Sequence, residues 1–247
     1  MRPFGAAALV VIALSPVLVE AGVARVWAVS DGEKIEQDDL ASPLRARNSA
    51  WDGTTVRLFG ARNEVIAFQV MVQSDARGIQ ALTAALPELR QRGGKGRIAY
   101  AAPGTDPSQT VGRPIEVFAV HYLSVTETTH AEWAWKPGSP AAPRDTTGWK
   151  PVQLVPENAR GGRGGLPLRV DGERNQSVWI EVYTPRDLPA GVYDGAITLT
   201  ADGRATRLPV ELQVFAFTLP DANSLDAMVY YEPSEPELYH GRNLDPA

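Results

Sequence analysis

The chain has 247 residues, a formal net charge of −5 and no cysteine. A mildly acidic chain without a basic stripe argues against nucleic acid as a partner. The absence of cysteine excludes disulfides, thiolate metal sites and cysteine nucleophiles. The 22 glycines and 20 prolines fall between short runs of alternating apolar residues, which predicts many turns and an all-β fold.

The N-terminus has the pattern of a secretory leader. Arg2 precedes an apolar run over residues 6–19, and the small residues Ala21 and Ala24 follow it. The run is too short to span a bilayer but fits the apolar region of a signal peptide with a cleavage site behind it. We therefore predict that residues 1–24 are removed and that the protein is exported to a periplasm, a cell surface or the medium. An N-terminal core segment is the alternative, and no second apolar run is long enough to predict a membrane span.

The first half of the remaining chain contains short runs with strand character: residues 25–29, 54–58, 64–73, 97–100 and 115–126. The third of these runs is apolar on both faces, which is typical of a central strand that is covered on both sides. Residues 79–89 are ambiguous, because their apolar spacing fits a helix whereas Pro87 would interrupt one.

Residues 128–167 are rich in Pro, Gly and Trp and show little periodicity. An irregular segment of this length within a compact domain is often functional. Trp133, Trp135 and Trp149 lie in it, and aromatic faces on loops can stack on the apolar faces of sugar rings. They are the candidate carbohydrate contacts. The alternative is that these tryptophans anchor the long loop to the rest of the fold.

The last third reads as three strands with their turns. Residues 178–183, 196–200 and 210–214 alternate or are rich in β-branched side chains. A turn over residues 188–191 joins the first two, and Asp202-Gly203 is a hairpin signal between the second and third. The pattern predicts an antiparallel sheet with one buried face and, for the whole domain, an antiparallel β-sandwich of two packed sheets.

The same stretch resembles the end of the N-terminal β-sandwich in secreted glycoside hydrolase family 123 and its DUF4091 relatives. The similarity is carried by VWIEVYTPRDLPAGVYDGAITLTADG at residues 178–203 and LPVELQVFAFTLP at residues 208–220. Three upstream segments follow the family's order: VWAVSDGEKI at residues 26–35, LFGARNEVIAFQVMVQ at residues 58–73 and IEVFAVHYLSV at residues 115–125. The resemblance also implies that residues 79–89 contain a strand that ends near Leu86.

The resemblance implies the domain organisation. Residues 25–220 would form the sandwich, and residues 221–247 would be a linker and the start of a truncated catalytic barrel. The family's neighbouring Asp-Glu pair lies in that barrel, and this chain contains no Asp-Glu dipeptide. Glu232, Glu235 and Glu237 lie among prolines, whereas catalytic groups need a rigid scaffold. No catalytic residue is therefore predicted within this chain.

No cofactor or metal is predicted either. His121, His130 and His240 lack the spacing of a metal site, and we expect His121 to be packed and hydrogen-bonded in its strand. The glycine-rich residues 161–165 lack the ending of a phosphate loop.

We therefore predict a non-catalytic domain of an exported family 123-like enzyme. The resemblance implies β-N-acetylgalactosaminidase activity for the complete enzyme. The domain would support or orient the downstream catalytic domain of the same polypeptide, and glycans are the other expected partner. A stand-alone secreted carbohydrate-binding or adhesion module is the alternative.

Overall fold

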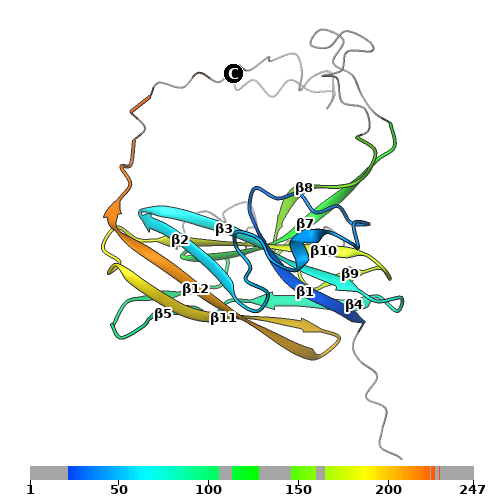
Figure 1. The fold of residues 1–247 in the computed structure, drawn as a ribbon, viewed down its shortest axis with the longest axis horizontal. Helices are drawn as coiled ribbons and strands as arrows, with labels where there is room; N and C mark the ends of the chain where they lie inside the picture. Colours follow the sequence, from blue (N-terminus) through cyan, green and yellow to red (C-terminus); the bar gives the residue numbers. More distant parts are fainter. Residues whose placement is uncertain are drawn as a thin grey trace, which may run out of the picture.

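A computed structural model describes residues 22–105, 113–127, 146–159, 165–222, 224, 225 and 228. The described residues form an all-β structure of strands with one short 3-10 helix (Figure 1). In chain order the elements are β1 (Val23–Ser30), η1 (Pro43–Arg45), β2 (Val56–Arg62), β3 (Glu64–Ser74), β4 (Ile79–Ala85), β5 (Glu88–Gln91), β6 (Arg97–Ala99), β7 (Ile115–Val125), β8 (Gly148–Pro156), β9 (Leu168–Val170), β10 (Asn175–Thr184), β11 (Gly191–Ala201) and β12 (Arg204–Thr218).

The strands form two packed sheets, as the sequence pattern predicts. One sheet has five strands in the order β1-β3-β10-β7-β8, and the other has β2-β12-β11-β4-β9 along its main path, with β5 beside β11 and β6 beside β5. Figure 1 shows β3, β7, β8 and β10 of the first sheet above β5, β11 and β12 of the second. The predicted sandwich is confirmed.

The core lies between the two sheets. In the five-stranded sheet, Phe68 of β3 is opposite Ile180 of β10, which is opposite Val117 of β7. In the other sheet, Leu212 of β12 is opposite Tyr193 of β11. All five side chains are buried in one hydrophobic cluster. Successive residues of a strand point to opposite faces, so these cross-strand rows explain the alternation in the sequence.

One pair of strands is parallel, unlike the fully antiparallel arrangement that we expected. β2 runs parallel to β12, with Val56 opposite Val210 and Leu58 opposite Leu212. The pairs within residues 178–214 are antiparallel because a tight hairpin joins β11 and β12, and Asp202 and Gly203 take the positive φ values of that turn, 48° and 82°. β2 arrives from a distant part of the chain and joins the edge that β12 leaves open, so no hairpin sets its direction.

Two segments differ in detail from their predictions. Residues 79–89 form β4 and the start of β5 rather than a helix, and β4 ends one residue before Leu86, as the resemblance implies. Residues 148–156, which we expected to be irregular, form β8. β8 contains Pro151 and Pro156 and pairs with β7 alone. Pro lacks an N–H donor and is tolerated on edge strands, so this strand leaves a weak sequence signal.

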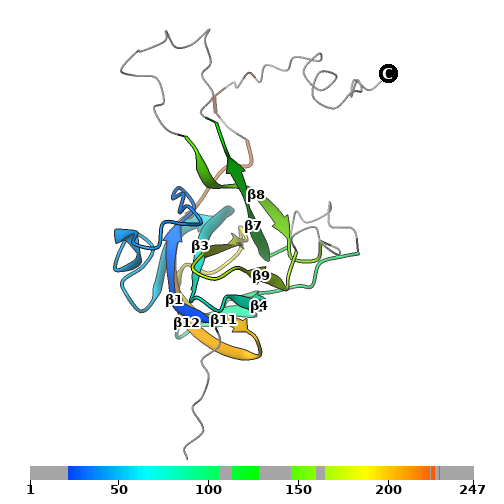
Figure 2. The same cartoon turned by 90° about the vertical axis from the view of Figure 1, so that its right-hand side faces the viewer.

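A third layer covers part of the outer face of the five-stranded sheet. Trp27 of β1 and Met71 of β3 are opposite each other and point away from the inner core row, yet both are fully buried. The segment between β1 and β2 lies beside β1 (Figure 2), and its Ile35 and Trp51 are also buried. Within the described ranges, no helix is long and apolar enough to cross a membrane.

Candidate functional site

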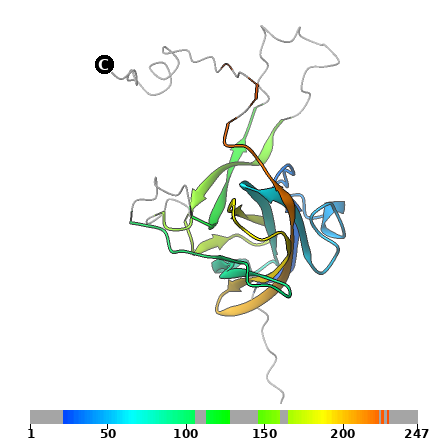
Figure 3. The same ribbon diagram turned by 90° about the vertical axis from the view of Figure 1, so that its left-hand side faces the viewer.

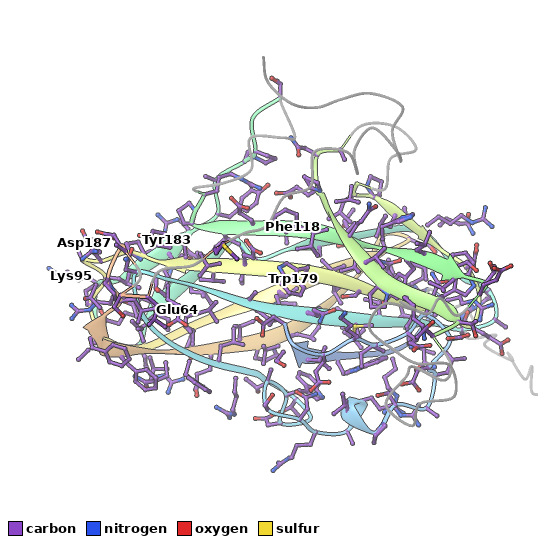
Figure 4. All side chains as sticks on the ribbon, turned by 90° about the horizontal axis from the view of Figure 1, so that it is seen from above. Glu64, Lys95, Phe118, Trp179, Tyr183 and Asp187 are labelled. Atoms are coloured by element: carbon purple, nitrogen blue, oxygen red, sulfur yellow. The ribbon has the colours of Figure 1, made fainter. Side chains whose placement is uncertain are left out.

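A cross-strand row with two aromatic side chains lies on the outer face of the five-stranded sheet. Trp179 of β10 is opposite Gln69 of β3 on one side and Phe118 of β7 on the other. Figure 4 looks onto this region and labels Trp179 and Phe118. Trp179 is half-buried, and its indole Nε1 donates a hydrogen bond to Glu181 Oε1 at 2.9 Å. Strand pairing therefore sets the position of the indole, and its hydrogen bond limits how the ring can turn.

A pocket of about 230 Å³ includes Trp179 and Gln69 of this row but not Phe118. Five polar residues line it: Asp31, Glu33, Lys34, Gln69 and Gln153. Five apolar or aromatic residues complete it: Val120, Pro151, Val152, Leu154 and Trp179. A pocket that combines an apolar and aromatic wall with polar groups has the usual composition of a small-molecule site.

Gln69 forms a fixed part of the lining. Its side chain is only 3% exposed. The amide nitrogen donates to Ser30 O at 3.1 Å and to Glu33 O at 2.7 Å, and the amide oxygen accepts from Ser177 Oγ at 2.9 Å. This buried side chain therefore ties the loop that carries Asp31 and Glu33 to the centre of the sheet.

The following residues of the same loop are held by three other strands. Tyr122 of β7 donates its hydroxyl hydrogen to Ile35 O at 3.2 Å. Asn175 of β10 donates its amide hydrogens to Glu36 O and Asp39 O at 3.0 and 2.7 Å. Lys150 of β8 forms an ion pair with the Glu36 carboxylate. The pocket rim is consequently positioned by side chains from most of the sheet.

The structure describes one of the three predicted carbohydrate contacts. Trp149 lies in β8 opposite Ser124 and is 38% exposed, two residues before the pocket residue Pro151. It lies near the pocket but does not line it. Trp133 and Trp135 lie outside the described residues. Their contact with sugar stays a prediction.

Trp179 is not among the predicted carbohydrate contacts, because it lies within the predicted strand over residues 178–183 rather than in a loop. The alternation of that strand contained the signal. Trp179 shares its parity with Glu181 and Tyr183, the more polar face of β10, whereas Val178 and Ile180 point to the core. A tryptophan on the polar face of a central strand either packs under another layer or borders a site, and here it borders a pocket.

A second polar group lies further along the same face. Glu116 of β7 is buried and lies opposite Glu181 of β10. Arg113 donates from Nη1 to Glu157 at 3.0 Å, and its Nε lies 3.9 Å from Glu116. Burial raises the pKa of the Glu116 carboxyl and repulsion by the carboxylates of Glu181 and Glu157 adds to the rise, whereas Arg113 opposes it. None of these four side chains lines the pocket, and the ion pair ties β7 to the end of β8.

His121 differs from its prediction, because it is exposed rather than packed. It lies opposite Gln153, beside a register shift between β7 and β8 that turns the strand outward. His130, His240, Glu232, Glu235 and Glu237 lie outside the described residues. Among the residues described, no group of three or more histidine, aspartate or glutamate side chains is placed to hold a metal ion.

Comparison with known proteins supports the fold. No family model matches the chain, and no curated protein matches it. Among solved structures, the chain is similar to a family 123 glycoside hydrolase from Clostridium perfringens, described in work on glycolipid glycan hydrolysis, with a TM-score of 0.52 and 15% identity. The match covers 79% of this chain and 28% of that enzyme, so the chain spans just over a quarter of the enzyme's length. Identity at this level shows a common fold.

Two further matches have lower scores. The match to the CooA pilin subunit from enterotoxigenic Escherichia coli covers 70% of this chain and 97% of the pilin chain, at 15% identity and a TM-score of 0.29. The match to the N-terminal domain of PorA covers 77% of this chain and 97% of the PorA domain, at 11% identity and a TM-score of 0.29. Scores of this size establish no shared fold.

Proposed function

We propose that this chain is the N-terminal β-sandwich domain of an exported enzyme related to glycoside hydrolase family 123 and DUF4091 proteins, and that it supports a catalytic domain following it in the same polypeptide. The observation that carries the proposal is the structural match over 79% of this chain to a limited part of a family 123 enzyme. The complete enzyme would hydrolyse a glycoside of the β-N-acetylgalactosaminide class. Residues 221–247 would then be the linker and the start of the catalytic barrel.

The geometry at the end of β12 supports this role, because the chain leaves the sandwich through a fixed joint (Figure 3, β12 in orange). Asn63, with φ at +61°, donates from Nδ2 to Leu219 O at 3.0 Å and to Asp221 Oδ1 at 2.9 Å. Its Oδ1 accepts from Tyr183 OH at 2.9 Å, and Arg186 pairs with Asp221 at 2.5 Å. A joint of this kind would orient whatever follows residue 221.

An aromatic patch beside this joint is a further support. Phe59 of β2 and Phe215 and Phe217 of β12 are exposed, with adjacent ring centroids 6.0 Å apart. Phe215 and Phe217 lie on the outer face of β12, whereas Leu212 and Val214 of the same strand are in the core. Clustered exposed phenylalanines are unusual on an uncovered surface and typically mark an interface.

The proposal is tested by hydrolysis of an aryl N-acetyl-β-galactosaminide. The polypeptide encoded by the complete gene is expected to release the aryl group, whereas the 247-residue chain is expected to show no turnover above buffer, because no positioned acid pair is predicted in it. Turnover by the 247-residue chain that persists after a second purification would contradict the assignment of catalysis to a following domain.

A stand-alone secreted carbohydrate-binding or adhesion module is the second candidate function. The pocket beside Trp179 favours it, because a binding module needs such a site whereas a supporting domain does not. The reading frame after Ala247 separates the two functions. A barrel-like sequence with a neighbouring Asp-Glu pair supports the enzyme, and a stop codon supports the module.

Export is part of both proposals and predicts a processed N-terminus. β1 begins at Val23, and Gly22 O accepts a hydrogen bond from Asp75 N at 2.7 Å. Cleavage after Ala21 would keep these pairings, whereas cleavage after Ala24 would remove them. We therefore expect the intact mass of exported protein to correspond to a start at Gly22, three residues before the Arg25 start that the sequence pattern predicts. An exported product that retains Met1 would contradict the signal-peptide prediction.

A further inference from the structure

We propose that the pocket on the outer face of the five-stranded sheet binds one uncharged pyranose ring, with Trp179 as the stacking surface. The site holds whether the domain precedes a catalytic domain or stands alone, so its test is separate from that of hydrolysis. The proposal rests on three features of the pocket, which are its apolar wall, the charges at its rim and its size.

The apolar wall matches the hydrophobic face of a sugar ring. Val152 and Leu154 of β8 are 50% and 41% exposed, and both line the pocket with Trp179. Val152 sits at the register shift between β7 and β8, where a bulge redirects side chains. A ring placed against these residues would cover exposed apolar surface and use the flat indole, as aromatic side chains do in sugar recognition.

The polar rim favours hydroxyl groups over charged ligands. Gln153 is exposed and can both donate and accept, Lys34 can donate, and Asp31 and Glu33 can accept. Two carboxylates against one ammonium leave the lining with a net charge of −1. A ligand carboxylate or phosphate would meet this negative charge, whereas a neutral ring can satisfy each group through its hydroxyls.

The size of the pocket limits the ligand to about one ring. Its 230 Å³ is below the range of about 300–1,000 Å³ for pockets that enclose drug-sized ligands. The rim is also prearranged, because Gln69 and Asn175 hold the loop that carries Asp31, Glu33 and Lys34. A preformed site loses less conformational entropy on binding, which helps a ligand that makes few contacts.

The test is an NMR titration of the full chain with galactose, glucose and N-acetylgalactosamine, with glucuronate as the charged comparison. We expect at least one neutral sugar to shift the indole N–H signal of Trp179, identified by its loss in Trp179→Phe, with a dissociation constant in the millimolar range. We expect glucuronate to bind about tenfold more weakly or not at all, since like charge opposes it.

Three substitutions separate this pocket from other surfaces. Trp179→Ala is expected to weaken sugar binding by about tenfold or more, and Gln153→Ala by about fivefold, the effect of one hydrogen bond. Leu154→Arg places a long side chain in the pocket from an exposed position, so it should block binding while the protein stays folded. Phe217→Ala, an exposed aromatic on the other sheet, is the matched control and should leave the affinity unchanged.

Several results would overturn the proposal. They are the absence of any shift with all three neutral sugars, tighter binding of glucuronate, or binding that survives both Trp179→Ala and Leu154→Arg. Loss of binding in Trp149→Ala with retention in Leu154→Arg would move the site to the neighbouring surface of β8 and would equally refute this assignment.

Discussion

Replacing Phe68 by alanine is expected to lower the free energy of unfolding by about 3–5 kcal/mol. Phe68 is fully buried on the inner face of β3, opposite Ile180 of β10. β3 lies between β1 and β10, so strands on both sides hold it in place. The sheet therefore cannot shift at this position to fill the space that the phenyl ring leaves. The loss combines the transfer of the ring to water with a cavity that close-packed neighbours fill only in part.

Equilibrium unfolding in urea, followed by circular dichroism, measures this effect as a lower midpoint at an unchanged slope. Phe217→Ala is the matched control, because Phe217 is 56% exposed and stacks on Phe215 alone among the described aromatic contacts. We expect it to cost less than about 1 kcal/mol. Similar losses in the two variants would mean that the core does not lie between these sheets.

The second large effect is expected from Gln69→Leu, which affects both stability and the pocket. Leucine fills a similar volume but removes the donors to Ser30 O and Glu33 O and the acceptor for Ser177 Oγ. Each buried polar group left unpaired costs about 1–3 kcal/mol. Ser30 O keeps a hydrogen bond from Glu33 N, so it is not left unpaired. We therefore expect the free energy of unfolding to fall by about 2–4 kcal/mol, less than the sum for three unpaired groups.

The same variant is expected to lose binding of neutral sugars, because the loop with Asp31 and Glu33 is no longer held against the sheet. Gln213→Leu is the control, since Gln213 is half-buried on the other sheet and its amide donates only to the neighbouring Val214 O, at 3.2 Å. It should change stability by about 0.5 kcal/mol or less and leave binding intact. A Gln69→Leu variant as stable as the parent chain would show that this buried network does not hold the loop.

Much of the fold could be predicted from local pattern alone. Strand periodicity is a property of neighbouring residues, so the strands at residues 64–73, 115–126 and 178–183 follow from alternation of apolar side chains. The Asp202-Gly203 turn is also local, because these residue types tolerate the positive φ that a tight hairpin requires. The all-β class follows from the number of such runs and the turn residues between them.

Partners that meet across the sheets could not be predicted in this way. The parallel pairing of β2 with β12 depends on which edge of a sheet is open, and the strand character of β8 depends on β7 as its neighbour. Phe215 and Phe217 share the parity of Glu211 and Gln213, so alternation places them on the polar face of β12. Whether another layer covers that face is not a local property, and the structure leaves both side chains exposed.

The candidate site shows most clearly which features follow from local sequence and which depend on tertiary packing. Aromatic and polar residue types suggested sugar contact, but the sequence directed attention to one tryptophan-rich segment. The pocket instead takes residues 31, 33, 34, 69, 120, 151–154 and 179 from five separate parts of the chain. Strand order brings them together, and strand order is set by packing of the sheets and their edges over the whole domain. The sequence by itself determined the strands and the sandwich class, and only the tertiary structure placed Trp179 beside a pocket.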